Sequence, residues 1–241
     1  PADGKFNRYN TVWVGDIKYK DLNGDGVIDE NDRTNIGSPM PKYTFGWNNT
    51  FRYKNFDLNV FINGSVGNKV MNYLSIKLTH MNSAWTNQLT TVNDRAQLVP
   101  IDPNKDYSGG VDVFGTTVYN WYDDITNVKV ANSGASIPRV SINDPNDNDR
   151  ISDRYIEDGS YVRLKNIALG YTFPKKLISK FKIENLRLYA NIQNLLTITG
   201  YDGYDPEVGA STSDSTGYTY GVDNGRYPSP TTFSFGMNIT F

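Results

Sequence analysis

The sequence predicts an all-β fold in which antiparallel strands form part of the wall of a transmembrane β-barrel. Five segments alternate apolar residues with small or polar ones, as strands do when their two faces meet different surroundings. Short connections join two pairs of these segments, whereas the other connections are long and polar. The sequence has no apolar run of about 18 residues or more, the length that a membrane-spanning helix needs. Such strands, with long loops on one side, are typical of outer-membrane barrels.

The last segment, Thr231–Phe241, shows the alternation most clearly. One face of an extended strand would carry only large apolar side chains, and the other only small or polar ones. The apolar set is Phe233, Phe235, Met237, Ile239 and Phe241, and the polar set is Thr232, Ser234, Gly236, Asn238 and Thr240. The length matches the roughly 9–11 residues with which a tilted strand crosses a bilayer. We therefore expect the apolar face to contact outer-membrane lipid and the polar face to line the lumen.

Four further strands precede this one as two pairs. Their predicted bounds are Tyr43–Tyr53, Phe56–Asn63, Tyr161–Phe173 and Asn185–Thr199. In the third of them, strict alternation puts Arg163 and Lys165 on the apolar face, at an end where they would lie among lipid head groups. Five strands cannot close a barrel, and an open sheet edge is not tolerated in lipid. We therefore expect the remaining strands upstream or in another chain.

The strands divide the chain into six segments. Because successive strands would cross the membrane in opposite directions, every long connection falls on the same side of it. The expected segments are an extracellular segment 1–42 with a calcium-type loop, a barrel hairpin 43–63, a long extracellular loop 64–160, a strand pair with a periplasmic turn 161–199, an extracellular loop 200–230 and a closing strand 231–241. Within the long loop, the residue pattern predicts short helices at Asn68–Met81 and Trp85–Ala96. Its length marks it as functional or as an inserted subdomain.

Composition excludes several classes of function. The net charge of the 241 residues is −2, which gives no reason to expect a nucleic-acid partner. The chain has no cysteine, so it can form neither a disulfide nor a thiolate metal site. Its single histidine, His80, has no nucleophile motif around it, and we expect a surface or helix-packing role. We expect Asp123 and Asp124 to be solvated loop acids, so no enzyme activity is predicted.

The sharpest local motif is a twelve-residue loop that fits the spacing of an EF-hand calcium site. Its expected ligands are Asp21, Asn23, Asp25, the carbonyl of Val27, Asp29 and Asp32. Gly26 would form the sharp turn. The motif departs from the usual pattern because Asp32 stands where EF-hands place a bidentate Glu, and because no helix is predicted before the loop. The sequence predicts a structural Ca²⁺ ion here, and the alternative is an Asx-rich turn that binds no ion.

Two groups in the long loop are candidates for binding. Trp85, Tyr119, Trp121 and Tyr122 could stack on sugar rings or other cargo, since an aromatic face with a polar edge suits amphipathic ligands. The alternative is that they pack the loop on itself or on a partner. Asp144, Asp147, Asp149 and Asp153 form an acidic patch that could take a second cation, although a solvated turn explains the patch better.

Four blocks in order along nearly the whole chain resemble SusC/RagA-type TonB-dependent outer-membrane transporters in their C-terminal part. They are GDIKYKDLNGDGVIDENDRTNIGSPMPKYTFGWNNTFRYKNFDLNVFINGSVGN, DRYIEDGSYVRLKNIALGYTFP, LRLYANIQNLLTITGYDGYDPEV and RYPSPTTFSFGMNITF. The resemblance implies a 22-stranded barrel in the bacterial outer membrane, an N-terminal plug, and energy supplied through TonB. It also implies a SusD-like surface lipoprotein as partner, and oligomeric glycans or peptides as cargo. Neither plug nor TonB box is recognisable here, so we do not expect this part to transport alone.

Three functions therefore remain open. The first is active import of oligomeric nutrients, to which this chain contributes barrel wall and surface loops. The second is an outer-membrane-anchored, calcium-stabilised binding or adhesion protein without active transport. The third is a soluble calcium-binding β-sandwich, because sandwich strands can alternate in the same way.

Overall fold

The computed structural model describes residues 12–81, 85–106, 111–113, 116–118, 126–142, 144–209, 211–213 and 217–241. The chain divides into two compact units, of which the first combines Pro1–Asn35 with Ser75–Ser152 and the second combines Ile36–Leu74 with Asp153–Phe241. Among the described residues, no helix is both long and apolar enough to cross a membrane.

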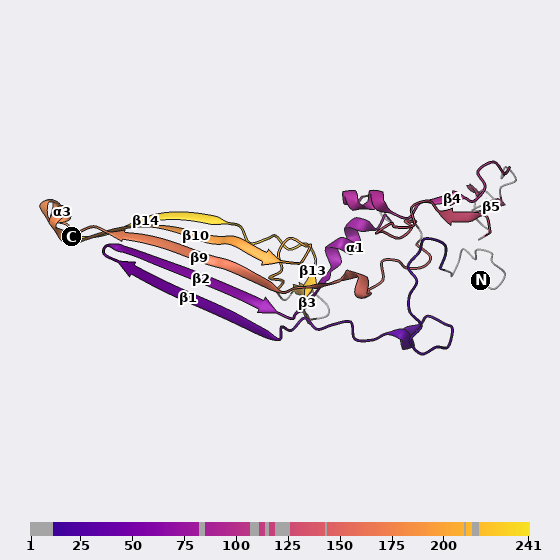
Figure 1. Cartoon of the computed structure of the whole chain (residues 1–241), viewed down its shortest axis with the longest axis horizontal. Coiled ribbons are helices and arrows are strands. Elements are labelled where there is room, and N and C mark those ends of the chain that lie inside the picture. The colour runs from indigo at the N-terminus through magenta and orange to yellow at the C-terminus, as the bar shows by residue number, and fades with distance from the viewer. Residues whose placement is uncertain are drawn as a thin grey trace. The chain divides into compact units, whose positions relative to one another are not determined.

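A five-stranded antiparallel sheet dominates the second unit (Figure 1). In spatial order its strands are β1 (Tyr43–Tyr53), β2 (Phe56–Val66), β9 (Tyr161–Thr172), β10 (Asn185–Thr199) and β14 (Thr232–Thr240). Each strand pairs with the next along this order. All five predicted strands are therefore present, and β2 alone extends clearly beyond its predicted end.

The two faces of this sheet differ in chemistry along whole rows of paired residues. One row reads Phe51, Leu58, Leu169, Ala190 and Phe235 across the five strands. The neighbouring row on the opposite face reads Thr50, Asn59, Ala168, Asn191 and Ser234. Large side chains of the first face are exposed, and Phe235 is 83% accessible. The period-two pattern of the sequence has thus produced a sheet with one continuous apolar face.

A β-bulge corrects one sequence prediction. Asn166 and Leu164 of β9 pair with consecutive residues of β2, so Lys165 between them has no partner in that ladder. The extra residue reverses the alternation, and Arg163 lies opposite Asn63 and Thr197 on the polar face. The expectation that Arg163 and Lys165 share the apolar face is therefore wrong, because it assumed an unbroken strand.

An ion pair spans three strands on the polar face. Arg187 of β10 donates to both carboxylate oxygens of Asp57 on β2, at 3.1 Å from Nε and 2.6 Å from Nη2. Between them on β9 lies Gly170, where a Cβ atom would come within 2.4 Å of Arg187 Nη2 and 2.5 Å of Asp57 Oδ1. The glycine therefore leaves the space in which two side chains meet over the intervening strand.

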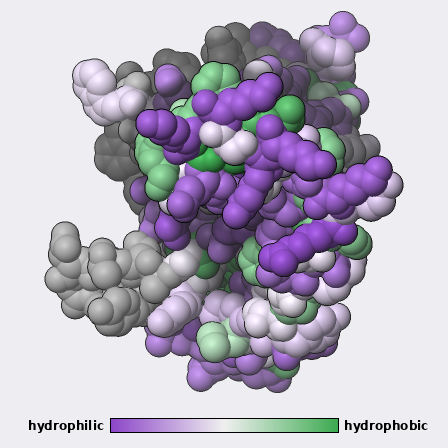
Figure 2. Space-filling model, turned by 90° about the vertical axis from the view of Figure 1, so that its left-hand side faces the viewer, coloured by the Kyte–Doolittle hydropathy of each residue, from purple (hydrophilic) through white to green (hydrophobic). Residues whose placement is uncertain are grey.

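Short connections close one end of the sheet. α3 (Lys175–Ile178) and η4 (Ser179–Phe181) lie between β9 and β10, and a two-residue turn with Lys54 at φ +53° lies between β1 and β2. Figure 2 faces this end of the molecule, and hydrophilic side chains cover most of the surface nearest the viewer, with smaller hydrophobic patches among them.

A small mixed sheet lies at the other end of the second unit (Figure 1). It contains β13 (Val222–Asp223), β3 (Lys69–Asn72) and β8 (Ile156–Asp158), with η3 (Asp153–Tyr155) directly before β8. The helix predicted for Asn68–Met81 is therefore shorter than expected, because β3 takes its first part and α1 spans Tyr73–Thr79. A further hairpin joins β11 (Ser211–Ser213) to β12 (Gly217–Thr219).

The first unit is built mostly of loops. Its described elements are most of α1, from Ser75 on, η1 (Glu30–Asp32), η2 (Thr90–Asp94), the pair β4 (Leu98–Pro100) and β7 (Val128–Val130), and the pair β5 (Val111–Val113) and β6 (Thr116–Val118). The helix predicted at Trp85–Ala96 is wrong, since only the 3-10 segment η2 forms there. Side chains buried in this unit include Trp13, Ile76, Val92, Val128 and Ile137.

Candidate functional site

A buried arginine fixes the loop after β10 to the polar face of the sheet. Arg163 is 2% exposed, and its guanidinium forms ion pairs with Asp205 and with Glu207 (2.8 Å) while Nε donates to Thr197 Oγ1 (2.8 Å). Asp205 also accepts hydrogen bonds from the backbone N–H groups of Glu207 (2.9 Å) and Ser229 (3.0 Å). Burial alone would raise the pKa of Asp205, but these donors lower it. The carboxylate therefore stays ionised and holds both ends of the loop.

A second buried contact fixes the same loop to the small sheet. Tyr201 is 5% exposed and donates its hydroxyl proton to Asp223 Oδ2 at 2.7 Å. Burial and the bond to Asp223 both raise the pKa of Tyr201, so the hydroxyl remains protonated. Asp223 Oδ1 accepts from the backbone N–H of Gly225 at 2.8 Å. Among the described residues between β10 and β14, those around Tyr201, Asp205 and Asp223 are thus anchored to the sheets by buried contacts.

The calcium-type loop is closed by its own carboxylates. Asp21 accepts hydrogen bonds from the N–H groups of Gly24 (2.6 Å) and Gly26 (2.8 Å), both of which have positive φ angles. Asp32 closes the other end by accepting from the N–H groups of Leu22 (2.7 Å) and Asp29 (2.9 Å). These backbone donors, with Asp29 the strongest, lower the pKa of Asp32. The six predicted ligand residues are therefore gathered in one tight loop.

The same hydrogen bonds also satisfy an Asx-rich turn without an ion. Within the described part of the chain, the carboxylates of this loop do not form a group of three ligand atoms close enough to share a cation. The EF-hand pattern uses a carbonyl and an amide oxygen as well, here from Val27 and Asn23. The calcium ion thus stays a prediction.

The predicted cargo-binding aromatics lie only partly within the described residues. Trp85 is 96% exposed, whereas Tyr119, Trp121 and Tyr122 fall outside the described ranges. A pocket of about 100 Å³ lies against the small mixed sheet, between Lys69, Met71, Ile156 and Tyr220 among others. It is smaller than the roughly 300–1,000 Å³ of typical ligand pockets. This pocket is therefore too small to hold an oligomer.

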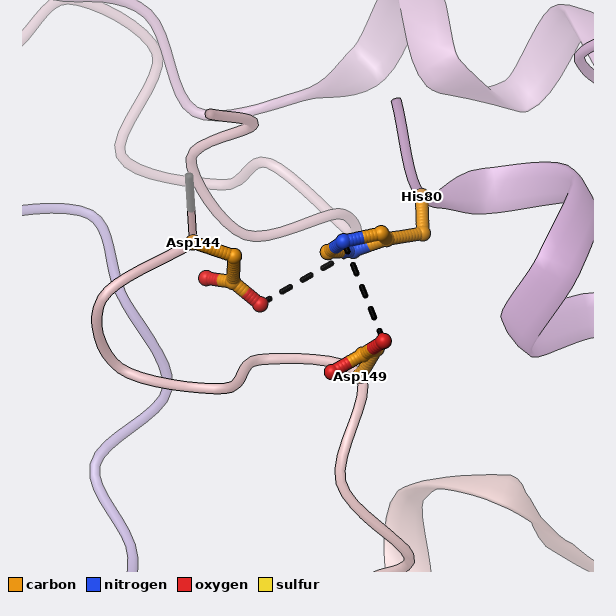
Figure 3. A group of neighbouring side chains, drawn as sticks. All are labelled: His80, Asp144 and Asp149. Atoms are coloured by element: carbon orange, nitrogen blue, oxygen red, sulfur yellow. Dashed lines mark ion pairs between the residues drawn. The ribbon is translucent and has the colours of Figure 1, made fainter. Parts of the chain in front are cut away.

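The acidic patch of the long loop has a partner that sequence analysis missed. Asp144 and Asp149 both approach His80, with Asp144 Oδ2 3.8 Å from Nδ1 and Asp149 Oδ2 3.8 Å from Nε2 (Figure 3). Asp147 and Asp153 do not belong to this group. His80 is not a surface residue, since its side chain is 11% exposed. Nothing in the sequence links residue 80 to residues 144–149, because the approach depends on how the loop folds back.

Known proteins with similar sequences cover nearly all of this chain, although no protein-family model matches it. TonB-dependent receptor P3 of Formosa agariphila is 34% identical over 225 residues, which are 92% of this chain and 19% of that protein. TonB-dependent receptor P26 of the same organism is 32% identical over 95% of this chain and 20% of that protein. TonB-dependent receptor SusC of Bacteroides thetaiotaomicron is 27% identical over 92% of this chain and 17% of that protein.

Solved structures agree on the fold. The RagAB peptide transporter superposes with a TM-score of 0.57 and 18% identity, over 90% of this chain and 20% of that one. The RagAB peptide importer in its open-open state superposes with a TM-score of 0.53 and 19% identity, over 85% of this chain and 18% of that one. This chain spans about a fifth of the length of these proteins. The resemblance seen in the sequence is thereby confirmed, because nearly the whole of this chain is similar to part of known TonB-dependent receptors, SusC among them.

Proposed function

We propose that this chain forms part of the barrel wall and surface loops of an outer-membrane importer of oligomeric nutrients. The observation that carries the proposal is the continuous apolar face of the five-stranded sheet, opposite a polar face with a cross-strand ion pair. Lipid would cover the apolar face, and the polar face would line a water-filled lumen. The relatives of this chain are named TonB-dependent receptors, which supports the proposal that the energy for import is supplied through TonB.

The edges of the sheet fit a larger barrel. β1 and β14 each pair with one neighbour in this chain, and a free edge in lipid leaves backbone groups unsatisfied. In the whole protein these edges would pair with further strands of a 22-stranded barrel, and a plug would fill the lumen. The short turns around α3 would then face the periplasm, and residues 64–160 and 200–230 would lie outside the cell.

The outer loops are the proposed contact surface for a SusD-like surface lipoprotein. In loop 200–230, the described residues around Tyr201 and Glu207 suit such a role, because side-chain contacts to Asp223 and Arg163 hold them in place before any partner binds. Exposed aromatics such as Trp85 would contact the lipoprotein or the cargo. The cargo would be an oligomeric glycan or peptide.

A structural Ca²⁺ ion in the loop 21–32 is also part of the proposal. The carboxylates of Asp21, Asp25, Asp29 and Asp32 repel one another in this short segment, and a hard cation with oxygen ligands would remove that repulsion. The ion would order the chain before β1 and would not touch cargo.

Replacing both Asp25 and Asp29 by alanine in the full-length protein is expected to remove one bound Ca²⁺ and to speed hydrogen exchange across residues 15–40. Glu30→Ala is the matched control, since Glu30 is exposed and stands at no ligand position. Calcium content by mass spectrometry and exchange rates with and without Ca²⁺ provide the measurements. An unchanged calcium content in the double variant would show that the motif is only a turn.

Uptake of labelled oligomers by cells separates import from adhesion. We expect the full-length protein to accumulate a labelled oligosaccharide or oligopeptide inside the cell, and inactivation of TonB to abolish this accumulation. Deletion of residues 85–149 is expected to leave the protein inserted, to release the co-purifying lipoprotein and to reduce uptake. Surface binding that survives TonB inactivation, with no accumulation in any strain, would favour the adhesion protein instead.

A further inference from the structure

Three side chains that can bind metal converge in the first unit from segments far apart in the sequence. His80 directly follows α1, whereas Asp144 and Asp149 lie on a tight loop (Figure 3). The two separations between an imidazole nitrogen and a carboxylate oxygen are both 3.8 Å, which is too long for a hydrogen bond. Two ligands of a tetrahedral ion with bonds of about 2.0–2.2 Å lie about 3.4 Å apart. The two separations involve different nitrogens of the ring, but one ligand atom from each of the three residues lies within 4.8 Å of the other two. Small movements of these side chains would bring the three atoms to the spacing of ligands of one ion.

Two atoms of this group are buried without a partner. Neither His80 Nε2 nor Asp144 Oδ2 has a hydrogen-bond partner among the described residues. Asp144 is 7% exposed, and burial raises the pKa of its carboxyl group although His80 opposes the shift. Leaving a buried polar atom unsatisfied destabilises the fold, and a charged atom more so. A cation between the three groups would satisfy both atoms at once.

A hydrogen-bond network aims Asp144 at the histidine. Asn148 Nδ2 donates to Asp144 Oδ1 at 2.9 Å and to Asp16 Oδ1 at 3.0 Å. Asn148 Oδ1 accepts from the backbone N–H of Ile17 (2.9 Å) and from Asn146 Nδ2 (2.8 Å). Because Oδ1 of Asp144 is engaged in this way, Oδ2 is left to point towards His80. Metal ligands are commonly oriented by such outer hydrogen bonds.

We propose that His80, Asp144 and Asp149 bind a divalent transition-metal ion, and that this ion is Zn²⁺. One imidazole nitrogen and two carboxylate oxygens suit Zn²⁺, whereas Ca²⁺ takes six to eight oxygen ligands. Two carboxylates and a neutral imidazole balance the charge of the ion, so that burying the ion carries only a small desolvation penalty. Water would complete the coordination on the side of Asp149, whose side chain is 37% exposed. The ion would tie the end of α1 to the loop 144–150 as a structural crosslink.

Zinc binding to the purified full-length protein tests this site. The protein is stripped with chelator and titrated with Zn²⁺ alone, in a buffer with millimolar Ca²⁺ to occupy sites that prefer oxygen ligands. We expect the variants His80→Gln and Asp149→Asn each to bind one equivalent of Zn²⁺ fewer than the wild type, or to bind Zn²⁺ at this site at least about tenfold more weakly. Asp147→Asn is the matched control from the same loop, because its side chain is 72% exposed and lies outside the group.

Hydrogen exchange supplies a second measurement. We expect Zn²⁺ to slow exchange of the amides in residues 144–150 of the wild type and of Asp147→Asn, but not of Asp149→Asn. Asp149 is partly exposed, so its replacement keeps the test valid if His80→Gln does not fold. Equal zinc stoichiometry and affinity in the wild type and in both ligand variants would overturn the proposal.

Discussion

Replacing Arg163 by methionine is expected to destabilise the closed form of the loop 200–209. The free energy needed to open this loop locally should fall by about 3 kcal/mol. Removal of one partner from a buried ion pair typically costs about 3–5 kcal/mol because the other charge is left uncompensated. We expect the lower end because Asp205 would still accept from two backbone N–H groups. Amide exchange at Glu207 and Ser229 should accelerate roughly 100-fold, since 1.36 kcal/mol corresponds to a factor of about ten.

Lys165→Met is the matched control for this variant. Lys165 belongs to the same strand and contacts Glu207 at 2.9 Å, and Arg163 contacts the same carboxylate at 2.8 Å. Both groups of the Lys165 pair are, however, partly exposed, and such pairs contribute about 0–1 kcal/mol. Exchange in the loop should therefore change less than about fivefold. Similar small effects in both variants would contradict the role assigned to Arg163.

Placing arginine at Met237 is expected to reduce the stability of the full-length protein in a bilayer by about 2–4 kcal/mol. Met237 lies next to Gly236 at the middle of β14 and is exposed on the apolar face. A guanidinium at that depth would be taken into hydrocarbon without a partner. Urea titration of the protein folded into lipid vesicles measures the loss.

The control for this prediction is Ser234→Arg, on the opposite face of the same strand. Ser234 pairs with Asn191 in the polar row, so an arginine there would reach the lumen. Asn238 is a poorer choice because it lies opposite Arg187, which would add repulsion between like charges. Ser234→Arg should cost much less than Met237→Arg. Equal costs at the two positions would contradict the assignment of the faces.

The large sheet could be predicted from the sequence because its signal is local. Alternation of apolar and polar residues requires only neighbouring positions, and it located β1 and β10 with their observed bounds. The calcium-type loop is local in the same sense, since its donors and acceptors all lie within residues 21–32. Short-range patterns therefore account for the five long strands and for the calcium-type loop.

Features that depend on distant partners could not be predicted. The bulge at Lys165 becomes visible only from the pairing with β2. Lys69–Asn72 were expected to be helical, but they form β3 because β8 and β13 supply backbone partners on both sides. The approach of Asp144 and Asp149 to His80 likewise depends on a loop held to residues 16 and 17 by Asn146 and Asn148. Tertiary contacts decided each of these positions.

The most direct test of the central claim is a scan of β14 with single cysteines carrying a spin label, in the full-length protein reconstituted in a bilayer. The claim is that one face of the sheet contacts lipid and the other lines an aqueous lumen. Collision rates with oxygen, which dissolves in lipid, should be high at Phe233, Phe235, Met237 and Ile239. Collision rates with a water-soluble nickel chelate should peak at the residues between them. Rates without a period of two, or a high nickel rate at both sets of positions, would contradict the barrel assignment.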